Sequence, residues 1–189
     1  MSDTSIFRRL RPISSVNKSQ VWMGLVVFVS LVFGLFVLPR IQPREGRSGT
    51  PVPEFSLPIV AGGDAGNRIS LQAQRGKVVV LDFWATWCGP CTEQTRILER
   101  FVATSPGDVQ VIGVNEGEEP ELLRKYFEQH TAKYPIVSDV DEQTGQVFRV
   151  QGLPTLAIID RAGKFSSVSN GVVAYARLAR LVAEASREH

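Results

Sequence analysis

The longest uninterrupted run of apolar side chains lies near the N-terminus, over residues 21–38. These 18 residues carry no charge, and Ser30 is their only polar side chain. The run is just long enough to cross a bilayer as a helix, and it is too long and too uniformly apolar for an amphipathic core helix. The pattern predicts a transmembrane anchor over residues 21–38, with a basic cytoplasmic stub over 1–20 and a linker over 39–51.

A cleaved signal peptide is the alternative interpretation of this apolar run. Residues 38–41 contain no small-residue cleavage pattern, so an uncleaved signal anchor is favoured. Four basic side chains precede the run and three follow it, a margin too small to decide its orientation. Because a signal anchor carries the following domain out of the cytoplasm, we expect a single-pass inner-membrane protein whose domain faces the periplasm or the cell exterior.

From residue 52 onward the apolar residues form shorter runs with strand or helix spacing. The predicted strands are 78–81, 109–114, 134–137, 155–160 and 164–168, after an N-terminal hairpin around 61–67. The predicted helices follow Cys91, begin at Pro120, and cover about 146–150 and 174–185. This order predicts an α/β fold over residues 52–187, with a mixed central sheet flanked by helices.

The helix predicted from Pro120 also carries finer patterns. Its apolar side chains are expected to form one inner stripe, made of Leu122, Leu123, Tyr126 and Phe127. Glu121 and Lys125 stand four residues apart and are expected to form an exposed ion pair. The acidic loop before the helix, residues 115–119, is interpreted as solvated charge near a helix N-terminus rather than as a metal site.

Composition and charge narrow the possible functions. The formal net charge of +2 is close to neutral, which excludes the strongly basic footprint of a nucleic-acid-binding protein. The chain contains only two cysteines and two histidines. An oxidising compartment permits structural disulfides but does not require them, so the low cysteine count fits an extracytoplasmic domain.

The two cysteines, Cys88 and Cys91, follow the most apolar predicted strand and stand at the start of a segment that is compatible with a helix. There the Cys88 sulfur would face unpaired backbone N–H groups, which favour the thiolate, so Cys88 is the predicted nucleophile. Cys91, about one turn further on, would attack a mixed disulfide and release the partner. Gly89 lets a partner backbone approach, and Pro90 fits the first turn of a helix.

Asp82 is the third predicted catalytic residue. It lies within an apolar strand between Leu81 and Phe83, where desolvation is expected to raise its pKa. It could then exchange protons with Cys91 near neutral pH. The alternative is a strand-end aspartate that is hydrogen-bonded to a backbone amide.

Residues 82–91, with the sequence DFWATWCGPC, resemble the active-site segment of the thioredoxin superfamily. A second stretch, Gly152-Leu153-Pro154-Thr155 before an apolar run, resembles the cis-proline loop of that superfamily. The start of the domain, with a Pro-x-Phe-x-Leu stretch, an Ile-Ser-Leu segment and a Gly-Lys-Val-Val-Val strand, is similar to the membrane-tethered TlpA/ResA-like branch. The similarity covers nearly all of residues 52–185.

The resemblance implies a thioredoxin-like fold and a thiol-disulfide oxidoreductase that acts on protein thiols and disulfides outside the cytoplasm. Its redox group would be the Cys88–Cys91 disulfide, with no other cofactor and no metal. The resemblance also implies a cis bond before Pro154, backbone pairing of that loop with the partner chain, and apolar partner contacts from Trp87 and Leu153. For Trp84, packing is the favoured role.

The Gly89-Pro90 linker is similar to that of reducing thioredoxins. This favours a reductase that receives electrons from a membrane thiol donor, with cytochrome c maturation as one process it could serve. Many relatives carry a glutamate three residues after the second cysteine, where this chain has Gln94, with Glu93 one position earlier. Many also have a helix-kinking proline a turn later, which residues 95–97 do not provide. Asp82 is therefore expected to take more of the proton transfer.

Other functions remain open on the sequence. A peroxidase of the peroxiredoxin type has a similar fold, but it requires a threonine three residues before the attacking cysteine, where Ala85 precedes Cys88. A zinc or copper module would need more ligands than the thiols, and only His130 and His189 offer imidazoles. A scaffold role would leave the paired thiols unexplained.

Overall fold

The computed structural model describes residues 18–32, 48–64, 66–105 and 107–187. The chain divides into two compact units, Met1–Glu45 and Gly46–His189. In the first unit the described element is helix α1 (Lys18–Val32), which covers 15 residues. It overlaps the predicted anchor, whose residues 33–38 lie outside the described ranges, as do most of the predicted stub and linker. Within the described ranges, no helix is both long enough and apolar enough to cross a membrane.

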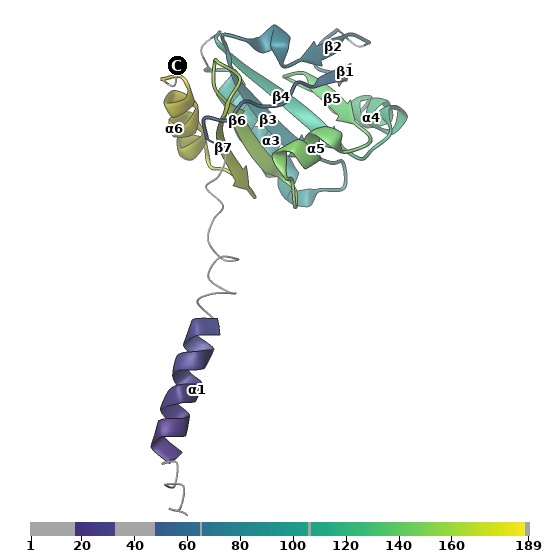
Figure 1. Cartoon of the computed structure of the whole chain (residues 1–189). Coiled ribbons are helices and arrows are strands. Elements are labelled where there is room, and N and C mark those ends of the chain that lie inside the picture. Colours follow the sequence, from purple (N-terminus) through teal and green to yellow (C-terminus); the bar gives the residue numbers. More distant parts are fainter. Residues whose placement is uncertain (1–17, 33–47, 65, 106, 188–189) are drawn as a thin grey trace, which may run out of the picture. The chain divides into compact units, whose positions relative to one another are not determined.

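The second unit is built on a seven-stranded mixed sheet with the order β2-β1-β5-β4-β3-β6-β7 (Figure 1). The strands are β1 (Ser56–Ala61), β2 (Arg68–Ser70), β3 (Val78–Trp84), β4 (Val109–Glu116), β5 (Ile136–Asp139), β6 (Thr155–Ile159) and β7 (Phe165–Asn170). Strand β3 pairs in parallel with β4 and antiparallel with β6. All seven of its residues are buried, which explains why all of them except Asp82 are apolar.

Helices pack on the sheet and cover its apolar side chains. They are the short 3-10 helix η2 (Gln72–Gln74), α3 (Gly89–Val102), α4 (Pro120–Phe127), α5 (Gln143–Phe148) and α6 (Tyr175–Ala185). Successive β3 side chains point to opposite faces. Val80 and Trp84 join the apolar cluster that contains Leu98 of α3 and Leu178 of α6. Phe83 joins the opposite cluster. The predicted thioredoxin-like α/β architecture is therefore confirmed for this unit.

The predicted N-terminal hairpin is also confirmed. Strands β1 and β2 form the N-terminal hairpin, with Ser56 opposite Ser70. Strands β6 and β7 form the second hairpin, and Gly163 between them has φ +75°, in the left-handed region that favours glycine. The backbone around Pro51 pairs with Lys164, so the globular unit includes residues that the sequence analysis assigned to the linker.

Other details of the prediction are wrong. Strand β5 begins at Ile136, two residues later than predicted, and α5 begins at Gln143 rather than near residue 146. Leu122 is 46% exposed, because the short helix α4 buries only Leu123 completely against the core. Glu121 forms its ion pair with Arg124, three residues further along the helix, at 2.5 Å. The predicted partner was Lys125, four residues further along.

Candidate active site

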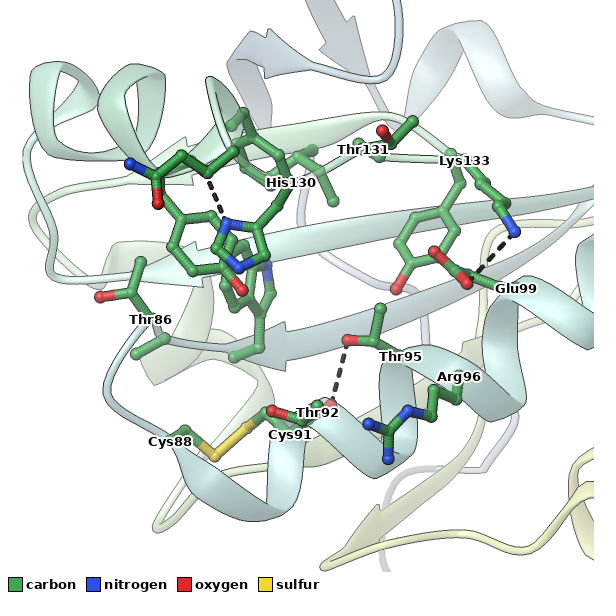
Figure 2. Close-up of a pocket in the computed structure, with 18 residues that line it drawn as sticks. Thr86, Cys88, Cys91, Thr92, Thr95, Arg96, Glu99, His130, Thr131 and Lys133 are labelled. Atoms are coloured by element: carbon green, nitrogen blue, oxygen red, sulfur yellow. Dashed lines mark hydrogen bonds and ion pairs between the residues drawn. A yellow bond between two sulfur atoms is a disulfide. The ribbon is translucent and has the colours of Figure 1, made fainter.

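The two cysteines lie at the start of α3, as predicted. Cys88 is the residue that caps the helix N-terminus, and Gly89 and Pro90 form its exposed first positions. The sulfur atoms of Cys88 and Cys91 are joined in a disulfide with an S–S distance of 2.00 Å and a Cα–Cα distance of 5.4 Å (Figure 2). Cys88 is 6% exposed and Cys91 is 2% exposed. Cys88 is thus the more exposed of the two cysteines, and it stands at the positive end of the helix dipole, as a nucleophile requires.

The two tryptophans before the cysteines differ in environment. Trp84 is buried, and its ring centroid lies 5.7 Å from that of Tyr126 and 6.0 Å from that of Phe127. Trp87 is 73% exposed and precedes the nucleophile. The packing role of Trp84 is therefore confirmed, and Trp87 is available for contact with a partner.

Asp82 is 1% exposed in the middle of β3, between Gly113 of β4 and Leu156 of β6. It alternates with Val80 and Trp84, so its side chain points to the face that α3 covers. Burial raises the pKa of Asp82 to about 7, and the Tyr134 hydroxyl partly opposes this rise. Neither carboxylate oxygen accepts a hydrogen bond from a described backbone amide, so the alternative interpretation of this residue is wrong.

The proline loop lies at the same end of the sheet as the cysteines. The peptide bond between Leu153 and Pro154 is cis, as the resemblance implied. Thr155 pairs with Phe83 of β3, which places Pro154 beside the end of the strand that leads to Cys88. Pro154 is buried and its carbonyl accepts a hydrogen bond from Gly171, while Leu153 is half-buried.

A cavity of about 330 Å³ adjoins the disulfide (Figure 2). Cys88 and two residues of α3, Cys91 and Thr95, line one side, and residues 129–134, after α4, line another. Thr95 donates a hydrogen bond from Oγ1 to the Cys91 carbonyl at 3.0 Å. His130 stacks on Tyr126 with ring centroids 3.9 Å apart. No local sequence pattern signals this wall, because residues 129–134 reach the cysteines only through the pairing of β4 with β5.

Tyrosine side chains in this cavity have raised pKa values. Burial and the nearby Asp82 charge raise the pKa of Tyr134, and burial together with Glu118 raises that of Tyr126. Both tyrosines are thus held in the neutral form, in which the hydroxyl can still donate a hydrogen bond.

The acidic loop, residues 115–119, was interpreted as solvated charge. This interpretation is wrong for two of its glutamates, Glu116 and Glu118, which are half-buried. Glu118 is half-buried, and its carboxylate accepts hydrogen bonds from Thr86 and Asn115. Desolvation, followed by the charges of Asp139 and Glu142, raises the pKa of Glu116 to about 8. Among the described residues, no cluster of histidine, cysteine, aspartate and glutamate side chains is arranged to hold a metal ion.

Gln94 occupies the position at which many relatives have a glutamate. It is completely buried, and its Oε1 accepts a hydrogen bond from the Val173 N–H at 2.7 Å. This contact ties α3 to the segment before α6, a structural role that a neutral amide performs without the cost of burying a charge.

Comparisons with known proteins agree with this geometry. The AhpC/TSA family model matches residues 48–168. The thiol-disulfide oxidoreductase ResA of Bacillus subtilis (strain 168) is 30% identical over 150 residues, which cover 79% of this chain and 82% of that protein. The ResA of Geobacillus kaustophilus is 31% identical over 79% of this chain and 84% of its own length. A solved thiol:disulfide interchange protein DsbE from Chlorobium tepidum is 31% identical, with a TM-score of 0.65, over 73% of this chain and 96% of that chain.

Proposed function

The chain belongs to the AhpC/TSA family and is a thiol-disulfide oxidoreductase similar to the ResA proteins, and on this premise we propose that it reduces protein disulfides outside the cytoplasm. The observation that carries the proposal is the Cys88–Cys91 disulfide at the N-terminus of α3. The cis-proline loop, at the same end of the sheet, supports an extended partner chain beside the disulfide.

In the proposed reaction the reduced protein supplies two electrons. The Cys88 thiolate attacks one sulfur of a partner disulfide, that S–S bond breaks, and the released partner sulfur leaves as a thiolate and takes up a proton. Cys91 then attacks the Cys88 sulfur of the mixed disulfide. This forms the Cys88–Cys91 disulfide and releases the second partner thiol. The partner disulfide is reduced and the Cys88–Cys91 dithiol is oxidised.

Asp82 is the proposed proton acceptor for Cys91. With a pKa of about 7, it is present in both charged and neutral forms near neutral pH. A carboxylate with an ordinary pKa would be a weaker base, so burial on the face that α3 covers is what suits Asp82 to this role. Trp87 and Leu153 are the proposed apolar contacts for the partner.

We also propose that residues 21–38 anchor the protein in the membrane, so that the redox unit faces the periplasm or the cell exterior. The uncharged sequence of these residues supports this, and the described part of the run is helical. A tethered reductase of this kind needs a thiol electron donor within the membrane to restore its dithiol. Cytochrome c maturation, in which haem attachment requires reduced cysteines, is the proposed process.

Insulin reduction by the full chain in detergent, with dithiothreitol as electron source, tests the chemistry. The Cys88→Ser variant is expected to lose the activity, because it removes the attacking sulfur. The Cys91→Ala variant is expected to accumulate a mixed disulfide with its substrate. Activity that survives in Cys88→Ser would contradict the nucleophile assignment, and peroxide consumption that exceeds insulin reduction would favour a peroxidase.

The direction of electron flow is tested by redox titration of the Cys88–Cys91 pair. A reductase is expected to have a potential near that of thioredoxin, about −270 mV. A value near that of a strong oxidant, about −120 mV, would reverse the proposed direction.

A further inference from the structure

We propose that Glu118 is a positioning residue of the redox site: its carboxylate fixes the loop between β3 and α3 and so holds Trp87 and Cys88 in the arrangement that a partner protein meets. This inference rests on the proposed function and adds to it a residue that lies 30 positions from the nucleophile.

The Glu118 carboxylate receives three hydrogen bonds. The Thr86 N–H donates to Oε2 at 2.7 Å, and the Thr86 hydroxyl donates to Oε1 at 2.5 Å. Asn115 Nδ2, at the end of β4, also donates to Oε2, at 2.6 Å. Hydrogen bonds to a charged acceptor are among the stronger ones in proteins. Both oxygens of one carboxylate are thus used to hold a single residue of the loop.

Glu118 is itself held in place by the rest of the sheet. Its backbone carbonyl accepts a hydrogen bond from the Ser138 hydroxyl of β5 at 3.4 Å. The preceding residue, Gly117, has φ +71° and donates its N–H to the Asp139 carbonyl at 3.1 Å. The carboxylate therefore connects the loop between β3 and α3 to the ends of two neighbouring parallel strands.

The loop that Glu118 holds is short, so a displacement of Thr86 reaches the nucleophile. Between the end of β3 and Cys88 lie only Ala85, Thr86 and Trp87. The Cys88 N–H donates to the Ala85 carbonyl at 3.1 Å, which closes a tight turn around Thr86 and Trp87. Figure 2 shows Thr86 on this loop at the edge of the cavity, above Cys88.

A general preference for acidic residues near a helix N-terminus does not explain these contacts. Glu119, which caps α4, is exposed and makes no side-chain capping hydrogen bond. It is the residue that the helix-dipole explanation fits. Glu118 instead directs its carboxylate at the redox loop, so Glu119 provides a matched control with the same charge one position away.

The test compares Glu118→Ala and Glu118→Gln with Glu119→Ala, all in the full chain in detergent. Two quantities are measured: kcat/KM for insulin reduction, and the pH midpoint for alkylation of Cys88 by iodoacetamide in the reduced protein. Glu118→Ala removes the hydrogen bonds that hold Thr86. It is expected to lower kcat/KM about tenfold, which is within what hydrogen bonds to a charged group contribute. Glu119→Ala is expected to keep the wild-type value.

The alkylation midpoint separates positioning from simple charge. If the loop moves, Cys88 leaves its place at the helix N-terminus and the midpoint shifts to higher pH in Glu118→Ala. If Glu118 acted only as a nearby negative charge, its removal would shift the midpoint to lower pH. An unchanged midpoint, or one that moves downward, overturns the proposal.

Thr86→Val removes the hydroxyl donor and keeps the backbone N–H. Its effect on kcat/KM is expected to be smaller than that of Glu118→Ala, and the double variant is expected to be no worse than Glu118→Ala alone. Additive effects would overturn the proposal.

If Glu118→Ala fails to fold, Glu118→Gln, which keeps one carbonyl acceptor, is measured in the same assays. An inactive wild type would refute the proposed function, whereas an active wild type with an unaffected Glu118→Ala would refute only the positioning role.

Discussion

Burial of Asp82 couples the stability of the domain to pH. Its pKa is about 7 in the folded protein, compared with an ordinary value of 3.8. Between these values the folded state keeps the proton and the unfolded state has lost it. The stabilisation of the folded state by the proton on Asp82 is therefore complete below about pH 4, and it is lost as the pH rises through about 7. A difference of roughly three pH units corresponds to about 4 kcal/mol.

The Asp82→Asn variant isolates this contribution. At pH 8 the free energy of unfolding is expected to rise by several kcal/mol, because the variant no longer buries a charge. At pH 4 the aspartate is already neutral in the folded state, so the two proteins are expected to differ little. Urea unfolding of the oxidised protein at both pH values measures this. Glu116, whose pKa is also raised, is present in both proteins and cancels from the comparison. Equal differences at both pH values would contradict the assignment.

Tyr134 is expected to tune the same carboxyl group. Its hydroxyl lowers the pKa of Asp82, so Tyr134→Phe is expected to raise that pKa above its value of about 7. The rising limb of the pH profile for insulin reduction should then move to higher pH. Tyr126→Phe is the control. It removes a hydroxyl from the same cavity, but that hydroxyl does not contribute to the pKa shift of Asp82. A profile that moves equally in both variants would show that Tyr134 has no specific role.

At the scale of elements, a single glycine in β4 makes room for the cavity wall. A Cβ at Gly113 would lie 2.6 Å from Ile136 Cδ1, 3.2 Å from Trp84 Nε1 and 3.3 Å from Tyr134 Cε2. Gly113 is also the β4 partner of Asp82. The absence of a side chain here thus lets a tyrosine and a tryptophan pack beside the buried acid.

Gly113→Ala is expected to destabilise the domain by about 1–3 kcal/mol, because the added methyl group overpacks this site. Gly107→Ala is the control, since a Cβ there would meet nothing within 4 Å and its φ is not in the left-handed region. Urea unfolding midpoints of the two variants and the wild type provide the measurement. A Gly113→Ala protein as stable as the Gly107→Ala protein would mean that Ile136 and its neighbours adjust at little cost.

The sequence predicted those elements whose residues interact locally. Cys88, Gly89 and Pro90 together specify the start of α3, and the apolar run of β3 specifies a buried strand. Strand β5 was misplaced because its last residues, Ser138 and Asp139, are polar yet buried. Asp139 is stabilised there by the N–H groups of Thr144 and Gly145, a contact that no local pattern signals.

The same distinction applies to the candidate site. Cys88, Cys91, Asp82 and Pro154 lie in short motifs and could be predicted from them. Glu118 could not, because its carboxylate meets Thr86 only after β3 and β4 have paired. Prediction of such residues requires the register of the sheet, which periodicity alone does not provide.

At the scale of the whole molecule, the redox chemistry and the predicted anchor belong to different units of the chain. The unit Gly46–His189 contains the complete sheet, both apolar clusters and every residue proposed to act in the reaction. The unit Met1–Glu45 contains the apolar run. Under the proposed function, catalysis belongs to one unit and membrane anchoring to the other, so each can be tested separately.

The cysteines provide a direct test of location, because Cys88 and Cys91 are the only two in the chain. In intact cells that express the protein, with any outer membrane made permeable, a thiol reagent that cannot cross the inner membrane is expected to modify the reduced pair. A Cys88→Ser/Cys91→Ser chain that carries Ser14→Cys in the predicted cytoplasmic stub is expected to react only after lysis. The opposite pattern would place the redox unit in the cytoplasm. The reductase chemistry would then stand, but the proposed membrane donor and extracytoplasmic partners would have to be abandoned.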